Sequence, residues 1–156
     1  MNIIIDSRQH AGKHELKHQW FLDHGIATCV CKLPVGDYAR FPEIAVDTKK
    51  DMQEIAGNIG GTAKEHARFR NELILAKDNG CKLYILVENR DGIKALNDVA
   101  LWKNPRARDN PKAIQGPRLF KAMCTMQERY GVTFLFCKPE DAAEIITMIL
   151  EGRYGV

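Results

Sequence analysis

Two aspartates and a lysine among the first fifty residues form the set with the clearest chemical meaning. Asp37 follows a glycine in an expected turn, and Asp47 and Lys49 stand two positions apart on an expected strand. Residues two apart on a strand project from the same face, so this carboxylate and this ammonium are expected together. A hairpin-like return of the chain would bring Asp37 opposite them. Asp6, at the end of the first apolar run, is a fourth candidate.

These side chains suit metal-assisted hydrolysis of a phosphodiester. Two carboxylates bind a hard divalent cation such as Mg²⁺ or Mn²⁺ through oxygen, with waters completing its coordination. The bound ion supplies Lewis-acid chemistry, and an adjacent lysine stabilises developing negative charge or orients a water molecule. The spacing alone also fits a surface Asp–Lys pair at a strand end. The apolar residues 44–46 instead favour a buried strand that delivers its charged end to one place.

The elements that must position these residues alternate between strands and helices. Apolar runs, turn residues and capping patterns predict strands at 2–5, 26–33, 43–49, 81–88 and 132–137, and helices at 13–24, 51–59, 62–79, 116–130 and 139–150. Thr62 and Glu65 have the spacing of a capping box. Residues 34–38 are expected to form a turn, 95–102 a short helix, and the rest of 91–115 an exposed loop. Strands alternating with helices predict an α/β fold.

Composition predicts one soluble domain of ordinary character. The chain has 156 residues, of which 45% are hydrophobic and 28% charged. No apolar stretch is long enough to span a membrane, and the N-terminal residues do not resemble a signal peptide, so a cytoplasmic location without membrane contact is expected. The five cysteines include no C-x-x-C pair, which predicts reduced, mostly buried thiols and no zinc site.

A basic stretch lies between Trp102 and Lys121, on a chain whose formal net charge is only +3. It holds six basic residues against the single acid Asp109, namely Lys103, Arg106, Arg108, Lys112, Arg118 and Lys121. This concentration indicates contact with a polyanion, with a solvated loop as the alternative. Trp102 either stacks on a base or, as we expect, belongs to the core. His14 and His18 could chelate a metal, but no third ligand is evident, so we expect a solvated helix face.

Three ordered motifs resemble the nuclease domain of the XPF-type structure-specific endonucleases, within the PD-(D/E)xK superfamily. They are Asp6-Ser7-Arg8-Gln9-His10, Val35-Gly36-Asp37-Tyr38 and Val46-Asp47-Thr48-Lys49. Arg68, Phe69 and Glu72, followed by Tyr84-Ile85-Leu86-Val87-Glu88, extend the resemblance to about residue 90. The resemblance implies a restriction-endonuclease-like α/β fold, in which helices flank a central mixed β-sheet.

The resemblance also implies an activity and partners. Members of this family cleave DNA near branches, flaps or junctions, with Mg²⁺ or Mn²⁺ as cofactor, and they form homodimers or heterodimers through the nuclease domain. Such activity belongs to DNA repair and recombination. Carried over by position, Asp37 and Asp47 become metal ligands, Lys49 the catalytic lysine and Asp6 a supporting catalytic carboxylate. The expected DNA-contacting residues are Arg8, Lys50, Lys103, Arg106, Arg108, Lys112, Arg118 and Lys121.

The sequence departs from the family pattern at four positions. Gln9 and Asp47 stand where the family has glutamate, Thr48 where it has arginine, and Gln53 where it has aspartate; the shorter Asp47 still suits a metal ligand. These departures keep open a non-catalytic DNA-binding or dimer-scaffold subunit with a degenerate site. A small-molecule-binding α/β protein is a third interpretation. The length leaves no room for helix-hairpin-helix modules, so residues 1–156 are expected to form a single nuclease domain, and this compactness points to a bacterial or phage source.

Overall fold

A six-stranded mixed sheet forms the centre of the chain in a computed structural model that describes residues 1–155. The strand order is β2-β1-β3-β4-β5-β6. Strand β3 runs antiparallel to β1 and β4, whereas the pairs β1–β2, β4–β5 and β5–β6 are parallel. The strand bounds are β1 (Asn2–Asp6), β2 (Ala27–Cys31), β3 (Tyr38–Arg40), β4 (Ile44–Lys49), β5 (Lys82–Glu88) and β6 (Thr133–Cys137).

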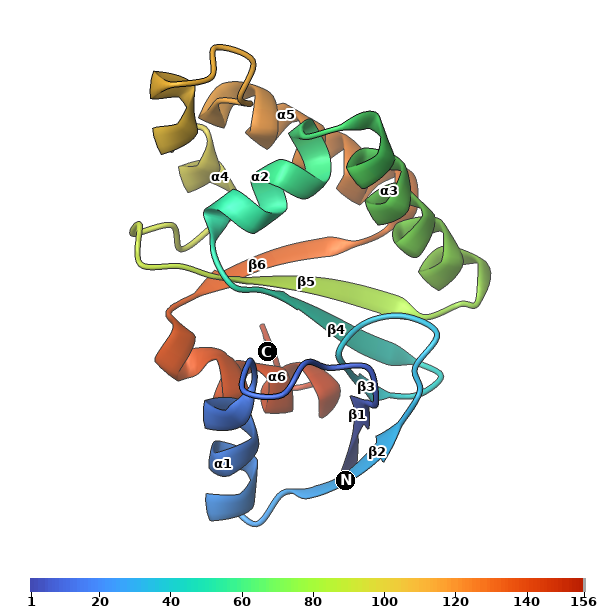
Figure 1. Cartoon of the computed structure of the whole chain (residues 1–156). Helices are drawn as coiled ribbons and strands as arrows, with labels where there is room; N and C mark the ends of the chain where they lie inside the picture. Colours follow the sequence, from blue (N-terminus) through green and yellow to red (C-terminus); the bar gives the residue numbers. More distant parts are fainter. Residues whose placement is uncertain (156) are drawn as a thin grey trace.

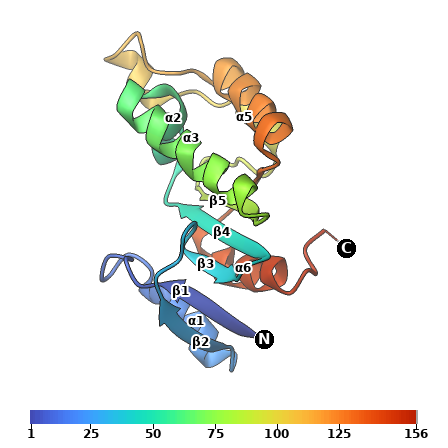
Figure 2. The ribbon, with the colours of Figure 1, turned by 90° about the vertical axis from the view of Figure 1, so that its right-hand side faces the viewer.

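Helices cover both faces of this sheet. Helices α2, α3, α4 and α5 lie on one side, and α1 and α6 lie on the other (Figure 1). A view turned by 90° shows α2, α3 and α5 grouped at one end, with β1, β2 and α1 at the other (Figure 2). The bounds are α1 (Glu15–Asp23), α2 (Met52–Gly60), α3 (Ala63–Asp78), α4 (Leu96–Val99), α5 (Gly116–Tyr130) and α6 (Ala142–Leu150), with 3₁₀ turns η1 (Pro105–Arg108) and η2 (Pro139–Asp141).

The two central strands explain why the sheet is covered twice. On β4, Ala45 packs into the core beneath α2 and α3, while Val46 packs into the core beneath α1 and α6. Their neighbours Ile85 and Leu86 on β5 divide in the same way, so the continuous apolar run of β5 is buried on both faces, as such runs are in α/β proteins. The predicted α/β architecture with a flanked mixed sheet is confirmed.

Strand β3 is the main element that the sequence pattern did not predict. The sequence predicts only a turn at residues 34–38, but the chain continues from Tyr38 into a three-residue strand. Its backbone pairs with β1 on one side and β4 on the other, so partners distant in sequence stabilise it. The predicted hairpin-like return before β4 is this β3–β4 pair. The capping box at the start of α3 is confirmed, because Thr62 and Glu65 exchange side-chain and backbone hydrogen bonds.

Several side chains have environments that differ from the expected ones. Trp102 is buried, as expected for a core residue. His14 is also buried and packs against the rings of His18 and Tyr38, so the expected solvated helix face is wrong there. The expectation of mostly buried thiols is also wrong, since Cys29 and Cys31 are exposed on the edge strand β2 and only Cys81 is buried. Among residues 1–155, no helix is both long and apolar enough to cross a membrane.

Candidate active site

The β3–β4 hairpin brings Asp37 to the strand that carries Asp47 and Lys49. The backbone amide of Asp37 donates to the carbonyl of Val46 at 2.8 Å. Gly36, immediately before, has φ of +78°, and a Cβ there would lie 3.0 Å from the Val46 carbonyl oxygen. Only glycine combines this left-handed backbone with so close an approach. The Gly-Asp-Tyr motif therefore fixes where the Asp37 carboxylate sits.

Thr48 holds the Asp37 carboxylate in place. Its backbone amide and its hydroxyl both donate to Asp37 Oδ2, at 2.8 and 2.7 Å. Burial raises the pKa of Asp37, and the two hydrogen bonds from Thr48 oppose that rise. The residue that replaces the family arginine therefore positions a carboxylate of the site.

Asp47 and Lys49 form a buried ion pair on the face of β4 that meets α2 and α3. The Lys49 ammonium lies 2.8 Å from Asp47 Oδ2 and 5.2 Å from the centre of the Phe69 ring. Burial raises the pKa of Asp47 to about 6, with Lys49 opposing this shift and Asp37 adding to it. Burial disfavours the charged ammonium of Lys49, but the Asp47 carboxylate outweighs it, so the pKa of Lys49 is raised. The predicted projection of these two side chains from one face is observed.

Glu72 is a further acid of the site, to which the sequence pattern assigned no role. It projects from α3 toward the hairpin, where one carboxylate oxygen accepts from the Gly36 amide at 3.4 Å. Burial raises the pKa of Glu72 to about 7, and the nearby charge of Asp47 contributes to the rise. The sequence held a signal for this, because Glu72 stands at helical spacing from the apolar residues Phe69 and Ala76 and so shares their face of the helix. Both of these neighbours are buried in the structure.

The N-terminal motif supports the hairpin from β1. Asp6 is 7% exposed, accepts from the Leu33 amide at 2.9 Å, and pairs with the Arg8 guanidinium at 3.2 Å. The side-chain amide of Gln9 donates to the Asp37 carbonyl at 2.8 Å. Asp6 and Gln9 therefore position the loop and backbone that hold Asp37. Arg8, more than half exposed, lies at the mouth of the site where a phosphate could reach it.

The carboxylates face one cavity whose donor set suits a hard divalent cation. Asp6, Asp37, Asp47 and Glu72 all line a cavity of about 350 Å³. Among residues 1–155, no group of three or more His, Cys, Asp or Glu side chains is arranged to hold a metal ion. Mg²⁺, however, is usually bound through one or two carboxylates, with waters and substrate phosphates as the remaining ligands. Asp37 and Asp47 fit that requirement, and Glu72 adds negative charge beside them.

The predicted basic residues are exposed, but the structure brings only some of them near the site. Lys50 and Arg106 line a hollow at the start of α2, and Lys112 lines the adjoining cavity. The remaining four are exposed and line neither of these two hollows, namely Lys103, Arg108, Arg118 and Lys121.

Glu72→Gln should stabilise the metal-free protein in a pH-dependent way. An acid whose folded pKa exceeds its unfolded value stabilises the fold at low pH, and this contribution is lost as the pH rises through the folded pKa. For Glu72 that window runs from 4.5 to about 7. Parent and variant should therefore match at about pH 4, and the variant should be more stable by on the order of 2 kcal/mol at about pH 8.

Urea unfolding in the presence of a chelator measures this difference. Glu128→Gln, which changes an exposed carboxylate on α5, is the matched control and should show no such divergence. Equal stability of parent and Glu72→Gln across the pH range would contradict the burial and charge assigned to Glu72.

The mixed sheet and the acids and lysine on its β3–β4 hairpin define a restriction-endonuclease-like nuclease fold. The family model described as "ERCC4 domain" matches residues 5–149, so the chain belongs to the ERCC4 domain family. This family comprises structure-specific DNA nucleases. A search of curated proteins gave no match.

Solved structures of a protein from Aeropyrum pernix are similar to this chain. "XPF from Aeropyrum pernix" matches with a TM-score of 0.68 and 18% identity, covering 97% of this chain and 64% of that one. A second structure, "XPF from Aeropyrum pernix, complex with DNA", matches with a TM-score of 0.68 and 18% identity, covering 96% and 63%. The chain thus spans somewhat less than two thirds of the length of these proteins, and the likeness establishes the fold.

Proposed function

We propose that this protein is a metal-dependent DNA endonuclease that hydrolyses phosphodiester bonds in branched or flap DNA. The observation that carries the proposal is the convergence of Asp37 and Asp47, with Lys49 paired to Asp47, at one open cavity of an ERCC4 domain. The preference for branched DNA follows from the family, and contact with DNA is supported by the similar Aeropyrum pernix protein solved in complex with it.

Each residue of the site has a distinct role in the proposal. Asp37 and Asp47 would hold Mg²⁺ or Mn²⁺, which supplies Lewis-acid chemistry and charge neutralisation when bound. The Lys49 ammonium stabilises negative charge that develops on the phosphate, or orients the attacking water. Thr48 and Asp6 keep Asp37 and its loop in place. Arg8, Lys50 and the basic residues at 103–121 contact the DNA backbone.

A dimer formed through this domain is part of the proposal. Strand β2 lies at the edge of the sheet, every residue of it is exposed, and Val30 on it is 70% exposed. An uncovered strand edge readily pairs with another chain. A homodimer or heterodimer that covered β2 would be consistent with this exposure, and a role in DNA repair or recombination would be consistent with cleavage of branched DNA.

Incubation with flapped, branched and linear DNA of matched length tests the proposal. We expect cleavage that needs Mg²⁺ or Mn²⁺ and that is faster on the branched substrates. Absence of cleavage with either ion on every substrate would overturn the proposed activity.

The second candidate is a non-catalytic DNA-binding or scaffold subunit, motivated by Thr48 and Gln53. Each has a structural role here: Thr48 binds Asp37, and the Gln53 amide donates to Asn104 at 2.9 Å. These contacts favour a working site with altered supports over a degenerate one. Calorimetric titration with Mn²⁺ separates the two candidates. A working site should bind the ion, and the Asp37→Ala variant should not bind it, whereas a degenerate site should show no such binding in the parent.

A further inference from the structure

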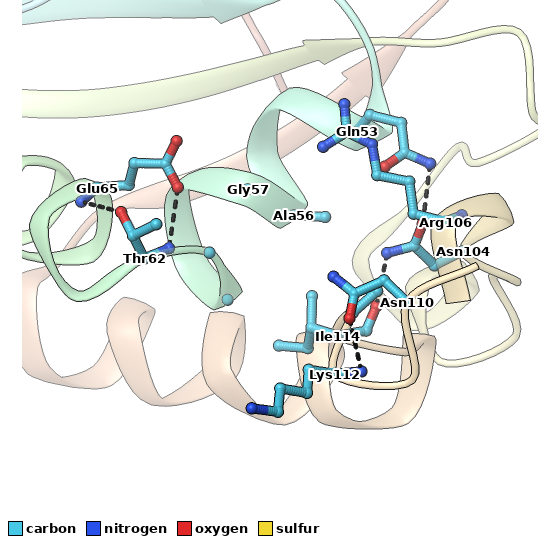
Figure 3. A pocket seen from close by; sticks show the side chains of 13 residues that line it. Gln53, Ala56, Gly57, Thr62, Glu65, Asn104, Arg106, Asn110, Lys112 and Ile114 are labelled. Atoms are coloured by element: carbon cyan, nitrogen blue, oxygen red, sulfur yellow. Dashed lines mark hydrogen bonds between the residues drawn. The ribbon is translucent and has the colours of Figure 1, made fainter. Parts of the chain in front are cut away.

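A second cavity lies between α2 and the segment 104–114, away from the catalytic carboxylates. It has a volume of about 290 Å³, close to the lower end of the range for small-ligand sites. One face of α2 forms a wall, and the segment 104–114 forms the opposite one (Figure 3). The first turn of α3 closes a third side through Thr62 and Glu65. We call it the α2 pocket.

The walls of the α2 pocket are fixed by hydrogen bonds. Asn104, only 6% exposed, accepts from the side-chain amide of Gln53 at 2.9 Å and donates to the carbonyl of Ile114 at 2.9 Å. Its carboxamide oxygen also accepts from the Arg106 amide at 3.0 Å. One buried side chain therefore joins both ends of the segment to α2. The pocket exists before any ligand arrives, which lowers the entropy cost of binding.

The pocket is open because α2 presents small residues to it. A Cβ added to Gly57 would meet no atom within 4 Å, so this position faces free space. Ala56 and Ile114 supply apolar surface, while Gln53 and Asn110 place amides around it (Figure 3). Apolar surface with amides at its margin suits a flat ring with polar edges, since amides pair with the edges of nucleobases.

The charged residues around the pocket favour a monoanion. Arg106 and Lys112 are its cations, and Glu65 is its only carboxylate. That carboxylate is already engaged, because it accepts from the Thr62 amide at 3.0 Å. A phosphodiester attached to the bound ring could lie against the guanidinium or the ammonium.

The α2 pocket continues toward the catalytic centre. Gln53, Gly57, Glu65 and Arg106 line both the pocket and the hollow at the start of α2. Asn58 and Glu65 in turn line both that hollow and the one that contains Lys49. Asp51 and Glu54 also line the hollow at the start of α2. Their negative charges would repel the phosphates of a strand that crosses this hollow, so the phosphates would face outward, toward Lys50.

We propose that the α2 pocket receives one unpaired nucleotide of the DNA strand that passes the catalytic centre, an inference that rests on the proposed nuclease function. Such a pocket distinguishes DNA structures, because it takes an unpaired nucleotide and not a paired one. A flapped or branched substrate offers an unpaired nucleotide at little cost, whereas a paired duplex must first be unstacked and unpaired.

Filling the pocket without changing its charge tests this inference. Gly57→Leu extends a side chain into the free space, and Gly57→Ala is the matched control that adds a single carbon. Binding of the full chain to fluorescein-labelled DNA is measured by anisotropy, with Ca²⁺ in place of Mg²⁺, for a flapped DNA and a fully paired duplex of equal length. We expect Gly57→Leu to weaken binding of the flapped DNA about tenfold, with duplex binding unchanged and Gly57→Ala like the parent.

Ala113→Leu fills the pocket from the opposite wall and provides a second test if Gly57→Leu does not fold. Binding of the flapped DNA at parent affinity by a folded, filled variant would overturn the inference. An equal loss of flapped and duplex binding would also overturn it, because the pocket would then not distinguish unpaired nucleotides. Failure of the parent to bind either DNA would instead refute the proposed nuclease function itself.

Discussion

Asp47→Asn should reduce the rate of DNA cleavage by about 10²- to 10³-fold, the scale on which removal of one preorganised electrostatic group acts in an active site. The substitution keeps the shape of the side chain but removes the charge that pairs with Lys49 at 2.8 Å and that would bind the cation. Single-turnover cleavage of flapped DNA, with protein in excess, isolates the chemical step. The loss should appear in the rate at saturating protein and should be accompanied by weaker Mn²⁺ binding in calorimetry.

The variant should remain folded, because the buried ammonium of Lys49 keeps a carboxylate of opposite charge nearby. Glu72 also lies close enough to raise the pKa of Lys49. Glu43→Gln is the matched control, since this carboxylate lies next to the same strand, is 69% exposed at its side chain, and pairs with the half-exposed Arg40. A folded Asp47→Asn protein that cuts DNA at the parent rate would remove Asp47 from the reaction.

The part of the site carried by β4 was predictable because the relation between Asp47 and Lys49 is local. Residues that stand two positions apart on a buried strand must project from the same face, whatever the rest of the chain does. Asp37 needed more than local pattern, since its approach depends on a return of the chain. The glycine before it was a usable signal, and the structure explains why: the Val46 carbonyl leaves no room for a side chain.

The parts that sequence patterns missed depend on contacts between distant segments. Strand β3 has three residues, too few for a periodic signal, and exists because β1 and β4 hold it from both sides. Glu72 joins the site only because α3 packs over the hairpin. The basic stretch was visible as composition, but only the fold places Arg106 and Lys112 beside the α2 pocket and leaves Lys103 away from it.

The buried face of α1 also depends on a contact with a distant segment, which the sequence pattern does not show. Leu16, Trp20 and Phe21 mark a helix by their spacing, yet Leu16 is 88% exposed and Lys17 is buried. Phe21 is fully buried on the same face of α1, and on β5 Glu88 is also buried, with its carboxylate 2.8 Å from the Lys17 ammonium. A charge partner supplied by a strand far along the chain therefore lets Lys17 lie on the inward face of α1 beside Phe21.

Lys17→Met should destabilise the protein by about 3 kcal/mol near about pH 8, because removing one partner of a buried ion pair leaves the other charge uncompensated. Methionine has similar length and fills the space, so the loss reports charge rather than volume. Burial already raises the pKa of Glu88, and Lys17 opposes that rise. Without Lys17 the Glu88 pKa should rise further, so the destabilisation should shrink as the pH falls toward about 5 and Glu88 becomes protonated.

Urea unfolding of Lys17→Met at both pH values measures this effect, with Lys64→Met as a control at an exposed lysine on α3. Adding Glu88→Gln to Lys17→Met removes the stranded charge and should restore most of the lost stability near about pH 8. A double variant no more stable than Lys17→Met would mean that packing around Lys17, and not its pairing with Glu88, holds α1 against the sheet. Because α1 and α6 cover the face of the sheet opposite Asp47 and Lys49, this measurement tests the fold independently of the proposed nuclease activity.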